Sequence, residues 1–357
     1  MGLHRNKRFG ATLLAIALTA TFAACGSDDS GSSGSSGGGG GSKDEKFTLG
    51  VSNTLVGNGW REEMICAVKA QALADGSVEK VLVSNQNGAA PEQIAAIRNL
   101  ISSGANAIII NPADATALNS VIAEAKRRDV KIISVDQAID SPDVLNVTND
   151  QKEYGKLGGE WLAKKLGGKG NILEMRGISG APADTARHEG FMEAIKANPG
   201  MKVVKETFTG WQFGTGGKQA LDVLQSGTKI DGIWTSGIDY SVVNALKTAK
   251  QEDVPVVGAD NNKFLGQLLE DTPGVAVTNP ATVGGVGAAV ALKALKGEEV
   301  EANTVLTPQV WDSENKADWE KYYDKALPPT YSSQLQVEPY TTYTDEQLKG
   351  CEGPGDA

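Results

Sequence analysis

The chain has 357 residues, with 34 Lys and Arg against 44 Asp and Glu, and carries a formal net charge of −10. This length suggests two domains, and the 40% hydrophobic fraction fits a globular protein instead of a multi-span membrane protein. The acidic balance argues against nucleic acid as a partner, because phosphate contacts need clustered Lys and Arg. The only two histidines, His4 and His188, cannot build a His-rich metal site, so no metal or cofactor is expected.

Residues 1–24 are predicted to be an export signal. The first ten residues carry three positive charges and no acid, and residues 11–24 are uncharged and mostly apolar. This run is too short to span a bilayer, which needs about 20 residues. The sequence Ala23-Ala24-Cys25-Gly26 resembles the cleavage site of bacterial lipoproteins, which implies that Cys25 carries a lipid. Ordinary signal cleavage, with Cys25 as a bystander, is the alternative.

A flexible tether is expected after Cys25, over residues 25–46. Residues 26–42 consist of eight Gly, seven Ser and two Asp, which cannot bury apolar surface. The two remaining cysteines are Cys66 and Cys351. Disulfides persist in exported proteins, so we expect a Cys66–Cys351 bridge that holds the C-terminal tail to the first helix. In the alternative, Cys66 is a small buried hydrophobic residue.

From residue 47 onward, strand and helix patterns alternate. In the first half we expect strands at 47–52, 78–84, 107–110, 131–135 and 144–148, and helices at 60–74, 91–103 and 118–125. In the second half we expect strands at 171–175, 202–207, 232–236, 254–258 and 275–279. The helices there are expected at 152–166, 189–197, 218–225, 241–250, 263–270 and 281–295.

Repeated β-α-β units predict an α/β fold with parallel sheets. Ten strands are too many for one compact layer, so we expect two doubly wound lobes with a boundary near residues 146–152. Open α/β sheets bind ligands beyond the carboxyl ends of their strands. Two facing lobes would therefore form a cleft between those ends.

The residues that follow the strands are mainly amides, carboxylates and aromatics, with one arginine. The candidate ligand-binding residues are Asn58, Trp60, Asp136, Gln137, Arg187, Trp211, Phe213, Asp239, Asp260 and Asn279. Carboxylates, amides and a guanidinium suit the paired hydroxyls of a sugar, whose C–H face packs on aromatic rings. Each Asn or Asp alone is also a common turn former, and Arg187 alone could be a solvated charge. Their joint occurrence at strand ends favours a binding cleft.

Signatures of an enzyme are weak. Outside the Gly/Ser-rich tether, the chain has no Gly-x-Ser-x-Gly elbow, and it has no complete phosphate-binding loop motif. Asp136 and Asp260 could serve as the two opposed carboxylates of an extracellular glycoside hydrolase. Simple binding, without catalytic residues, is the preferred interpretation.

Several motifs together resemble the periplasmic binding proteins of the ribose-binding type, over residues 47–310. The motifs are Asn58-Gly59-Trp60-Arg61, Ile109-Ile110-Asn111-Pro112, Ile133-Ser134-Val135-Asp136-Gln137, Ala186-Arg187-His188-Glu189-Gly190-Phe191, Val256-Val257-Gly258-Ala259-Asp260 and Val277-Thr278-Asn279-Pro280. The resemblance implies that a sugar cleft is lined by Asn58, Trp60, Asp136, Arg187, Asp260, Asn279 and either Trp211 or Phe213. Gln137 stands where the ribose-binding pattern has Arg, and Gly237-Ile238-Asp239 stands where the pattern has an Asn-Asp pair. The resemblance therefore does not identify which sugar or sugar alcohol would bind.

The resemblance also implies a type I fold in which three segments, near 149–152, 279–281 and 303–308, form a hinge. We expect residues 47–149 with 281–304 to form one lobe and residues 150–280 with 305–325 to form the other. A C-terminal extension, 326–357, exceeds the family core and is expected to pack over the lobes or hinge.

The sequence thus predicts a monomeric lipoprotein on the outer face of the cell membrane. It would capture a monosaccharide or polyol and deliver it to the permease of an ABC importer. Presentation of the ligand to a signalling receptor remains an alternative role, and a nucleoside or quorum signal remains an alternative ligand.

Overall fold

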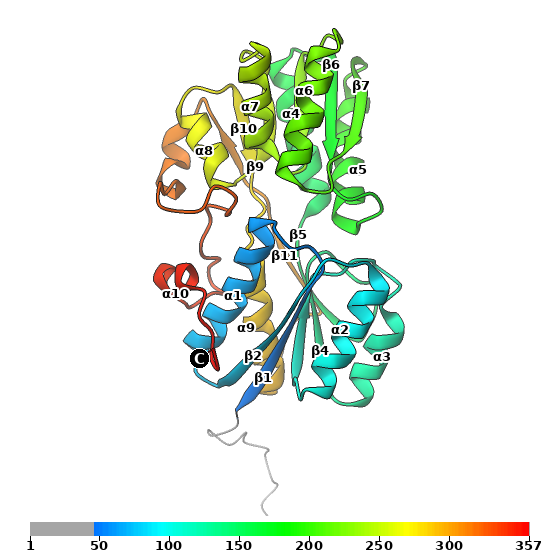
Figure 1. Cartoon of the computed structure of the whole chain (residues 1–357), viewed down its shortest axis with the longest axis vertical. Helices are drawn as coiled ribbons and strands as arrows, with labels where there is room; N and C mark the ends of the chain where they lie inside the picture. Colours follow the sequence, from blue (N-terminus) through cyan, green and yellow to red (C-terminus); the bar gives the residue numbers. More distant parts are fainter. Residues whose placement is uncertain (1–45, 357) are drawn as a thin grey trace, which may run out of the picture. The chain divides into compact units, whose positions relative to one another are not determined.

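The computed structural model describes residues 46–356, which all lie in one compact unit. The expected signal at 1–24, the lipid-bearing Cys25 and nearly all of the tether lie outside the described residues. Two six-stranded sheets, each with helices on both faces, form two lobes (Figure 1). The predicted α/β fold with two lobes is confirmed.

The first lobe is built on a parallel sheet in the order β11-β5-β4-β3-β1-β2. Its strands are β1 (Phe47–Asn53), β2 (Val78–Asn85), β3 (Ala107–Ile110), β4 (Lys131–Asp136), β5 (Val144–Asn149) and β11 (Asn303–Leu306). Its helices are α1 (Gly59–Asp75), α2 (Ala90–Ser102), α3 (Asn119–Arg127) and α9 (Val283–Leu295). Apolar residues of α1 and α9 pack on one face of the sheet, and those of α2 and α3 on the other.

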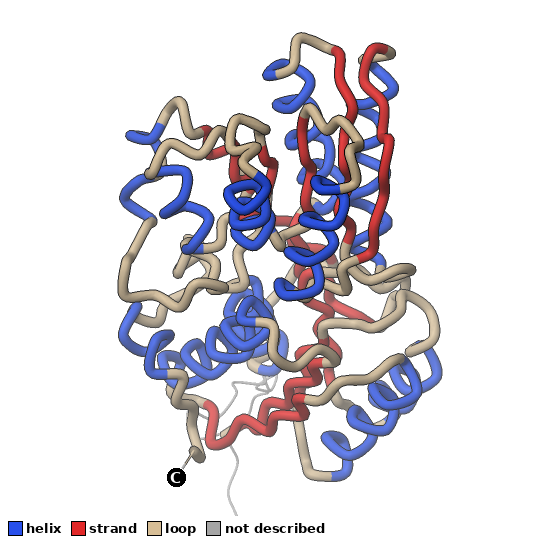
Figure 2. Tube along the Cα trace, turned by 45° about the horizontal axis from the view of Figure 1, so that its top comes forward, coloured by secondary structure: helices blue, strands red, loops and turns tan. Residues whose placement is uncertain are grey.

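The second lobe has the sheet order β12-β10-β9-β8-β6-β7. Its strands are β6 (Lys169–Arg176), β7 (Gly200–Phe208), β8 (Gly232–Thr235), β9 (Val256–Ala259), β10 (Gly274–Val277) and β12 (Val310–Asp312). Its helices are α4 (Gln151–Lys165), α5 (Pro182–Ala197), α6 (Phe213–Gln225), α7 (Asp239–Ala249) and α8 (Asn262–Leu269). Helices α4 and α5 cover one face, and α6, α7 and α8 the other; Figure 2 gives a second view of these layers.

The structure differs from the expected elements in three main places, one of which is helix α6, which begins at Phe213 and not at residue 218. Two further strands, β11 and β12, follow the last expected helix, and β12 runs antiparallel to β10. Helix α5 begins at Pro182, not at residue 189, because Pro182 occupies the first turn, where its missing N–H costs nothing, and Asp184 favours the same end. Arg187 therefore lies inside a helix and not at its start.

The three expected connections between the lobes are β5–α4, β10–α9 and β11–β12. The tail makes a fourth. Its residue Trp319 is buried in the core of the second lobe. Trp319 stands between two short 3₁₀ helices, η1 (Lys316–Asp318) and η2 (Glu320–Tyr322). The tail then returns to the first lobe, where α10 (Asp345–Gly350) lies beside α1 (Figure 1). A disulfide joins Cys351 to Cys66 there.

Within residues 46–356, no helix has the length and apolar character needed to cross a membrane.

Candidate functional site

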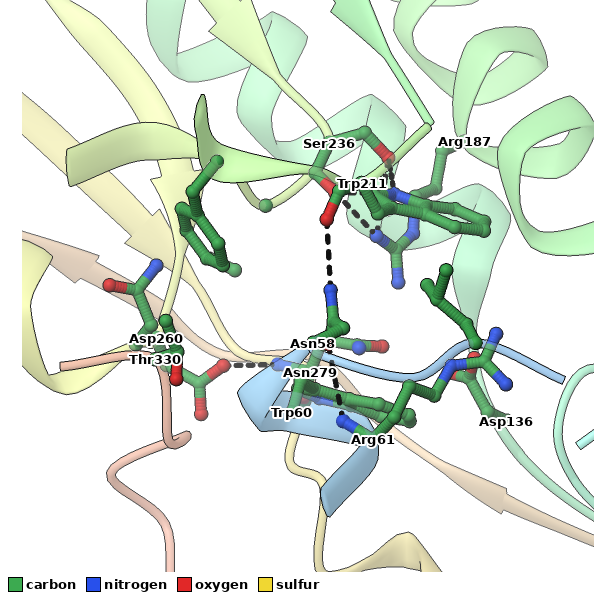
Figure 3. Close-up of a pocket in the computed structure, with 15 residues that line it drawn as sticks. Asn58, Trp60, Arg61, Asp136, Arg187, Trp211, Ser236, Asp260, Asn279 and Thr330 are labelled. Atoms are coloured by element: carbon green, nitrogen blue, oxygen red, sulfur yellow. Dashed lines mark hydrogen bonds between the residues drawn. The ribbon is translucent and has the colours of Figure 1, made fainter. Parts of the chain in front are cut away.

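A pocket lies between the carboxyl ends of the strands of the two lobes (Figure 3). The lining residues are Leu55, Asn58, Trp60, Arg61, Asp136, Arg187, Trp211, Phe213, Ser236, Gly237, Ala259, Asp260, Asn261, Asn279 and Thr330. Eight of the ten predicted ligand-binding residues are among them.

The first turn of α1 brings three side chains to the pocket. Asn58 caps the helix, because its side-chain oxygen accepts a hydrogen bond from the Arg61 N–H at 3.2 Å. Trp60 donates from its indole nitrogen to the carbonyl of Asn279 at 2.7 Å, which fixes its ring at the wall. Arg61 is buried and donates to Asn53 at 3.2 Å, and burial lowers the pKa of its guanidinium to about 10. The cap and first turn of α1 thus form one wall of the pocket, with both polar and aromatic groups.

Arg187 is held by a close helix crossing. A Cβ on Gly155 of α4 would lie 1.9 Å from the Arg187 carbonyl oxygen, so only glycine lets α4 and α5 approach this closely. The guanidinium carbon lies 4.4 Å from the ring centroid of Tyr154. Its Nε donates to Gln151 at 2.7 Å and its Nη1 to the carbonyl of Ser236 at 3.1 Å. Its Nη2 has no protein partner among residues 46–356, which leaves an N–H group for a ligand.

Gln151, the first residue of α4, connects the two lobes at the site. Its side-chain nitrogen donates to the Asp136 carboxylate at 2.7 Å, and its oxygen accepts from Arg187. Asp136 of the first lobe and Arg187 of the second are thereby oriented through one buried amide.

Asp260 lines the pocket and has one unsatisfied carboxylate oxygen. It is fully buried, and its Oδ1 accepts the Asn279 N–H at 2.8 Å. Its Oδ2 has no hydrogen-bond partner among the described residues. Burial raises the pKa of this carboxyl to about 7, and the charge of Asp239 adds to the shift while Arg187 opposes it. A buried carboxylate oxygen without a donor is costly, and a ligand hydroxyl would supply that donor.

Two aromatic residues of the second lobe complete the walls. Trp211 donates from its indole nitrogen to the Ser236 carbonyl at 2.9 Å. Phe213 is the first residue of α6 and stacks on Tyr240, with ring centroids 4.5 Å apart. Both rings are fixed by these contacts, and the pocket therefore has rigid apolar surfaces beside its polar groups.

Gln137 and Asp239, both predicted to bind ligand, do not line the pocket. The Gln137 amide donates to Asn111 at 2.6 Å and accepts from the Ala183 N–H at 3.1 Å, so it ties β4 to the start of α5. Asp239 accepts from the Ala259 N–H at 2.7 Å and from the Asn261 side chain. Burial raises its pKa to about 6. Gln137 thus binds the backbone of Ala183, and Asp239 binds the backbone of the lining residue Ala259.

The sequence interpretation missed several lining residues. Arg61, Ser236 and Asn261 each adjoin a residue or strand end that was named, so adjacency was the available signal. Thr330 lies in the tail, far from any strand end, and nothing in the sequence pointed to it. Two arginines and two aspartates line the pocket, and the near balance of charge suits an uncharged ligand.

Among the described residues, one group of possible metal ligands lies together: Glu174, His188 and Glu206. None of them lines the pocket. His188 contacts Glu174 at 2.6 Å, and Arg176 pairs with Glu206 at 3.2 Å. One of the three possible ligands, Glu206, is therefore already paired with a guanidinium.

Comparison with known proteins gives consistent matches. The sequence model of the family described as periplasmic binding protein domain matches residues 49–299. The xylitol-binding protein of Mycolicibacterium smegmatis is 26% identical over 309 residues, covering 85% of each chain. The ribose import binding protein RbsB of Salmonella typhimurium is 28% identical over 62% of this chain and 76% of its own.

A solved structure is also similar to this chain. An ABC transporter solute binding protein from Bacillus halodurans with bound myo-inositol has a TM-score of 0.72 and 26% identity. The match covers 79% of this chain and 99% of that one. All three relatives are named as binding proteins and none as an enzyme.

Proposed function

Because the chain belongs to the periplasmic binding protein family, we propose that it binds a neutral monosaccharide or related polyol between its two lobes. The observation that carries the proposal is that Asp260 lines the pocket and that its buried Oδ2 has no hydrogen-bond donor among the described residues. The free N–H group of Arg187 lies in the same pocket and supplies the complementary donor. A ligand with adjacent hydroxyls would satisfy both, since each hydroxyl can donate and accept.

The relatives support a polyol over a charged ligand. Two relatives are named for xylitol and ribose, and the structure from Bacillus halodurans holds myo-inositol; all three compounds are uncharged and rich in hydroxyls. The pocket of this chain combines two acids and two arginines with fixed aromatic walls. An anionic ligand would leave Asp136 and Asp260 opposed to its charge, and a cation would oppose the arginines.

Isothermal titration calorimetry against a panel of aldoses, ketoses and polyols tests the proposal. We expect one class to bind and to raise the thermal unfolding midpoint, because a ligand that binds only the folded state stabilises it. Charged sugar acids and sugar phosphates serve as matched controls and should not bind. An absence of binding to every neutral member of the panel would contradict the proposed function.

Delivery to an ABC importer, export and the lipid anchor on Cys25 are parts of the same proposal. The chain would act as a tethered monomer that releases its ligand to the permease. Labelling of cells with a radioactive fatty acid should tag the protein, and Cys25→Ala should abolish the label. Cells that lack the protein should lose uptake of the ligand and regain it on complementation.

A further inference from the structure

The tail segment 329–333 forms an edge beside the pocket. The Lys263 N–H donates to the Pro329 carbonyl at 3.0 Å, and the Asn262 N–H donates to Tyr331 at 2.8 Å. The Ser333 N–H returns a bond to the carbonyl of Asp260 at 2.9 Å. The tail therefore pairs with the loop that carries Asp260 into the pocket, and fixes that loop by backbone bonds.

The same segment is fixed to the first lobe through Ser332. Its N–H donates to Glu63 Oε2 at 2.6 Å, and its hydroxyl donates to Oε1 at 3.3 Å. Glu63 lies on α1, is fully buried, and has a pKa raised by that burial. The hydroxyl of Ser332 also accepts the Ala281 N–H at 3.0 Å. A buried acid needs hydrogen-bond donors, and Ser332 supplies them to Glu63. The tail is therefore fixed to α1 at this point.

Thr330 lies between these two attachments and faces the pocket (Figure 3). A Cβ on Gly59 would stand 1.7 Å from the Thr330 hydroxyl oxygen, so the tail occupies space that a larger residue 59 would fill. Within the described residues, the structure records no hydrogen bond of this hydroxyl with the protein. The half-buried side chain packs against Gly59, and its hydroxyl remains available to another partner.

We infer that Thr330 is a specificity-determining residue that hydrogen-bonds one hydroxyl of the bound polyol and limits ligand size on its side. This inference rests on the proposed function and adds a wall that the family match, which ends at residue 299, does not include. The tail provides this wall because it crosses from the second lobe to the first at the pocket and is fixed on both sides. Thr330 consequently contacts the ligand from an element outside both sheets.

Three substitutions separate the hydroxyl from the bulk of the side chain. Thr330→Val keeps the shape and removes the hydroxyl, and should weaken the best neutral ligand about tenfold. Thr330→Ser keeps the hydroxyl and should stay within about threefold of the parent protein. The matched control is Thr248→Ala on the exposed surface of α7, which lies outside the pocket and should leave affinity unchanged.

A series of deoxy analogues gives a readout that a purely structural role would not move. In the parent protein each missing hydroxyl should cost affinity. In Thr330→Val, the one analogue that lacks the hydroxyl facing residue 330 should lose no further affinity, which is the signature of a removed pairwise contact. Thr330→Gly should in addition admit the ligand methylated at that hydroxyl, which the parent protein rejects.

The outcomes distinguish the two proposals. If the parent protein binds a polyol but Thr330→Val binds it equally well and responds equally to every deoxy analogue, the role of Thr330 is wrong and the proposed function stands. If the parent protein binds no neutral ligand, both proposals fail. Unfolding midpoints of all variants, measured without ligand, identify any variant that has lost its fold. If Thr330→Val does not fold, the same deoxy series on Thr330→Gly, which also lacks the hydroxyl, decides the matter.

Discussion

The side-chain nitrogen of Asn58, on the first lobe, donates a hydrogen bond to the carbonyl of Trp211, on the second, at 3.0 Å. The oxygen of the same amide caps α1 by accepting from Arg61. One residue therefore performs two tasks, one within a lobe and one between the lobes. Both residues line the pocket, so the bond crosses the region where ligand would be enclosed.

Two substitutions of Asn58 should separate these tasks. Asn58→Asp keeps a good cap but loses the donor to Trp211, so ligand affinity should fall about tenfold while thermal stability changes little. Asn58→Ala loses both, and stability should also fall by about 1 kcal/mol. Calorimetric titration and denaturant unfolding measure the two effects. Equal affinity in Asn58→Asp and the parent protein would show that the bond between lobes does not contribute to closure.

Asp260 should make the ligand-free protein less stable as pH rises. Its folded pKa of about 7 exceeds the usual value near 4, so the folded state binds the proton more tightly than the unfolded state. The free energy of unfolding should therefore fall between about pH 4 and pH 7, by about 1 kcal/mol per pH unit from this group. Urea unfolding at stepwise pH measures the slope.

Asp260→Asn removes this titrating carboxyl group. The free energy of unfolding should therefore depend less steeply on pH over the same range. Asp222→Asn serves as the matched control, because Asp222 is an exposed carboxylate on α6 paired with Lys218. The control should leave the slope as it is in the parent protein. An unchanged slope in Asp260→Asn would place the titrating group elsewhere, with Asp239 as the next candidate because burial also raises its pKa.

Arg187→Ala should lower ligand affinity by about 100-fold and leave unfolding cooperative. The guanidinium orients Gln151 and Ser236 and offers its remaining N–H group to the pocket, and bonds to charged groups are the stronger ones. Arg187→Lys should recover little, because an ammonium lacks the planar fork. Arg98→Ala, an exposed arginine of α2, is the control. Retained affinity in Arg187→Ala would exclude Arg187 from the site.

Much of the fold and pocket could be predicted from the sequence, because ligands bind beyond the carboxyl ends of the strands in open α/β sheets. Short apolar runs such as Ala107–Ile110 indicate strands covered on both faces, and Asp136 and Asp260 follow such strands into the pocket. The same rule failed for Gln137 because it predicts where a residue lies and not what its side chain contacts. The Gln137 amide is bound by Asn111 and Ala183, which approach only in the folded protein.

The tail was the least predictable part. Residues 326–335 have no helical or strand period, and their position depends on backbone bonds to the loop at Asn262 and on the buried acid Glu63. A buried glutamate in an otherwise apolar helix face gives no sequence signal of its partner. The pairing of Ser332 with Glu63, 269 positions apart, becomes visible only in three dimensions.

Gly59→Ala should disturb the pocket through the tail. The new methyl group would overlap Thr330, whose Oγ1 and Cβ would lie 1.7 and 2.6 Å away. Alanine suits the helical backbone at this position, so any loss comes from the clash. We expect weaker ligand binding and a stability loss of about 1–3 kcal/mol. The double variant Gly59→Ala with Thr330→Gly should regain most of that stability, and equal stability of the single and double variants would contradict the overlap.

Removal of the Cys66–Cys351 disulfide should destabilise the protein more than it weakens ligand binding. The bridge closes a loop with a sequence separation of 285, and its loss restores freedom to the unfolded chain. Cys66→Ala with Cys351→Ala should lower the free energy of unfolding by about 2–5 kcal/mol. Affinity should change little, because Ser332 still fixes the pocket segment to Glu63. Equal unfolding free energies with and without the bridge, in guanidinium titrations, would show that α10 is held to α1 by apolar packing alone.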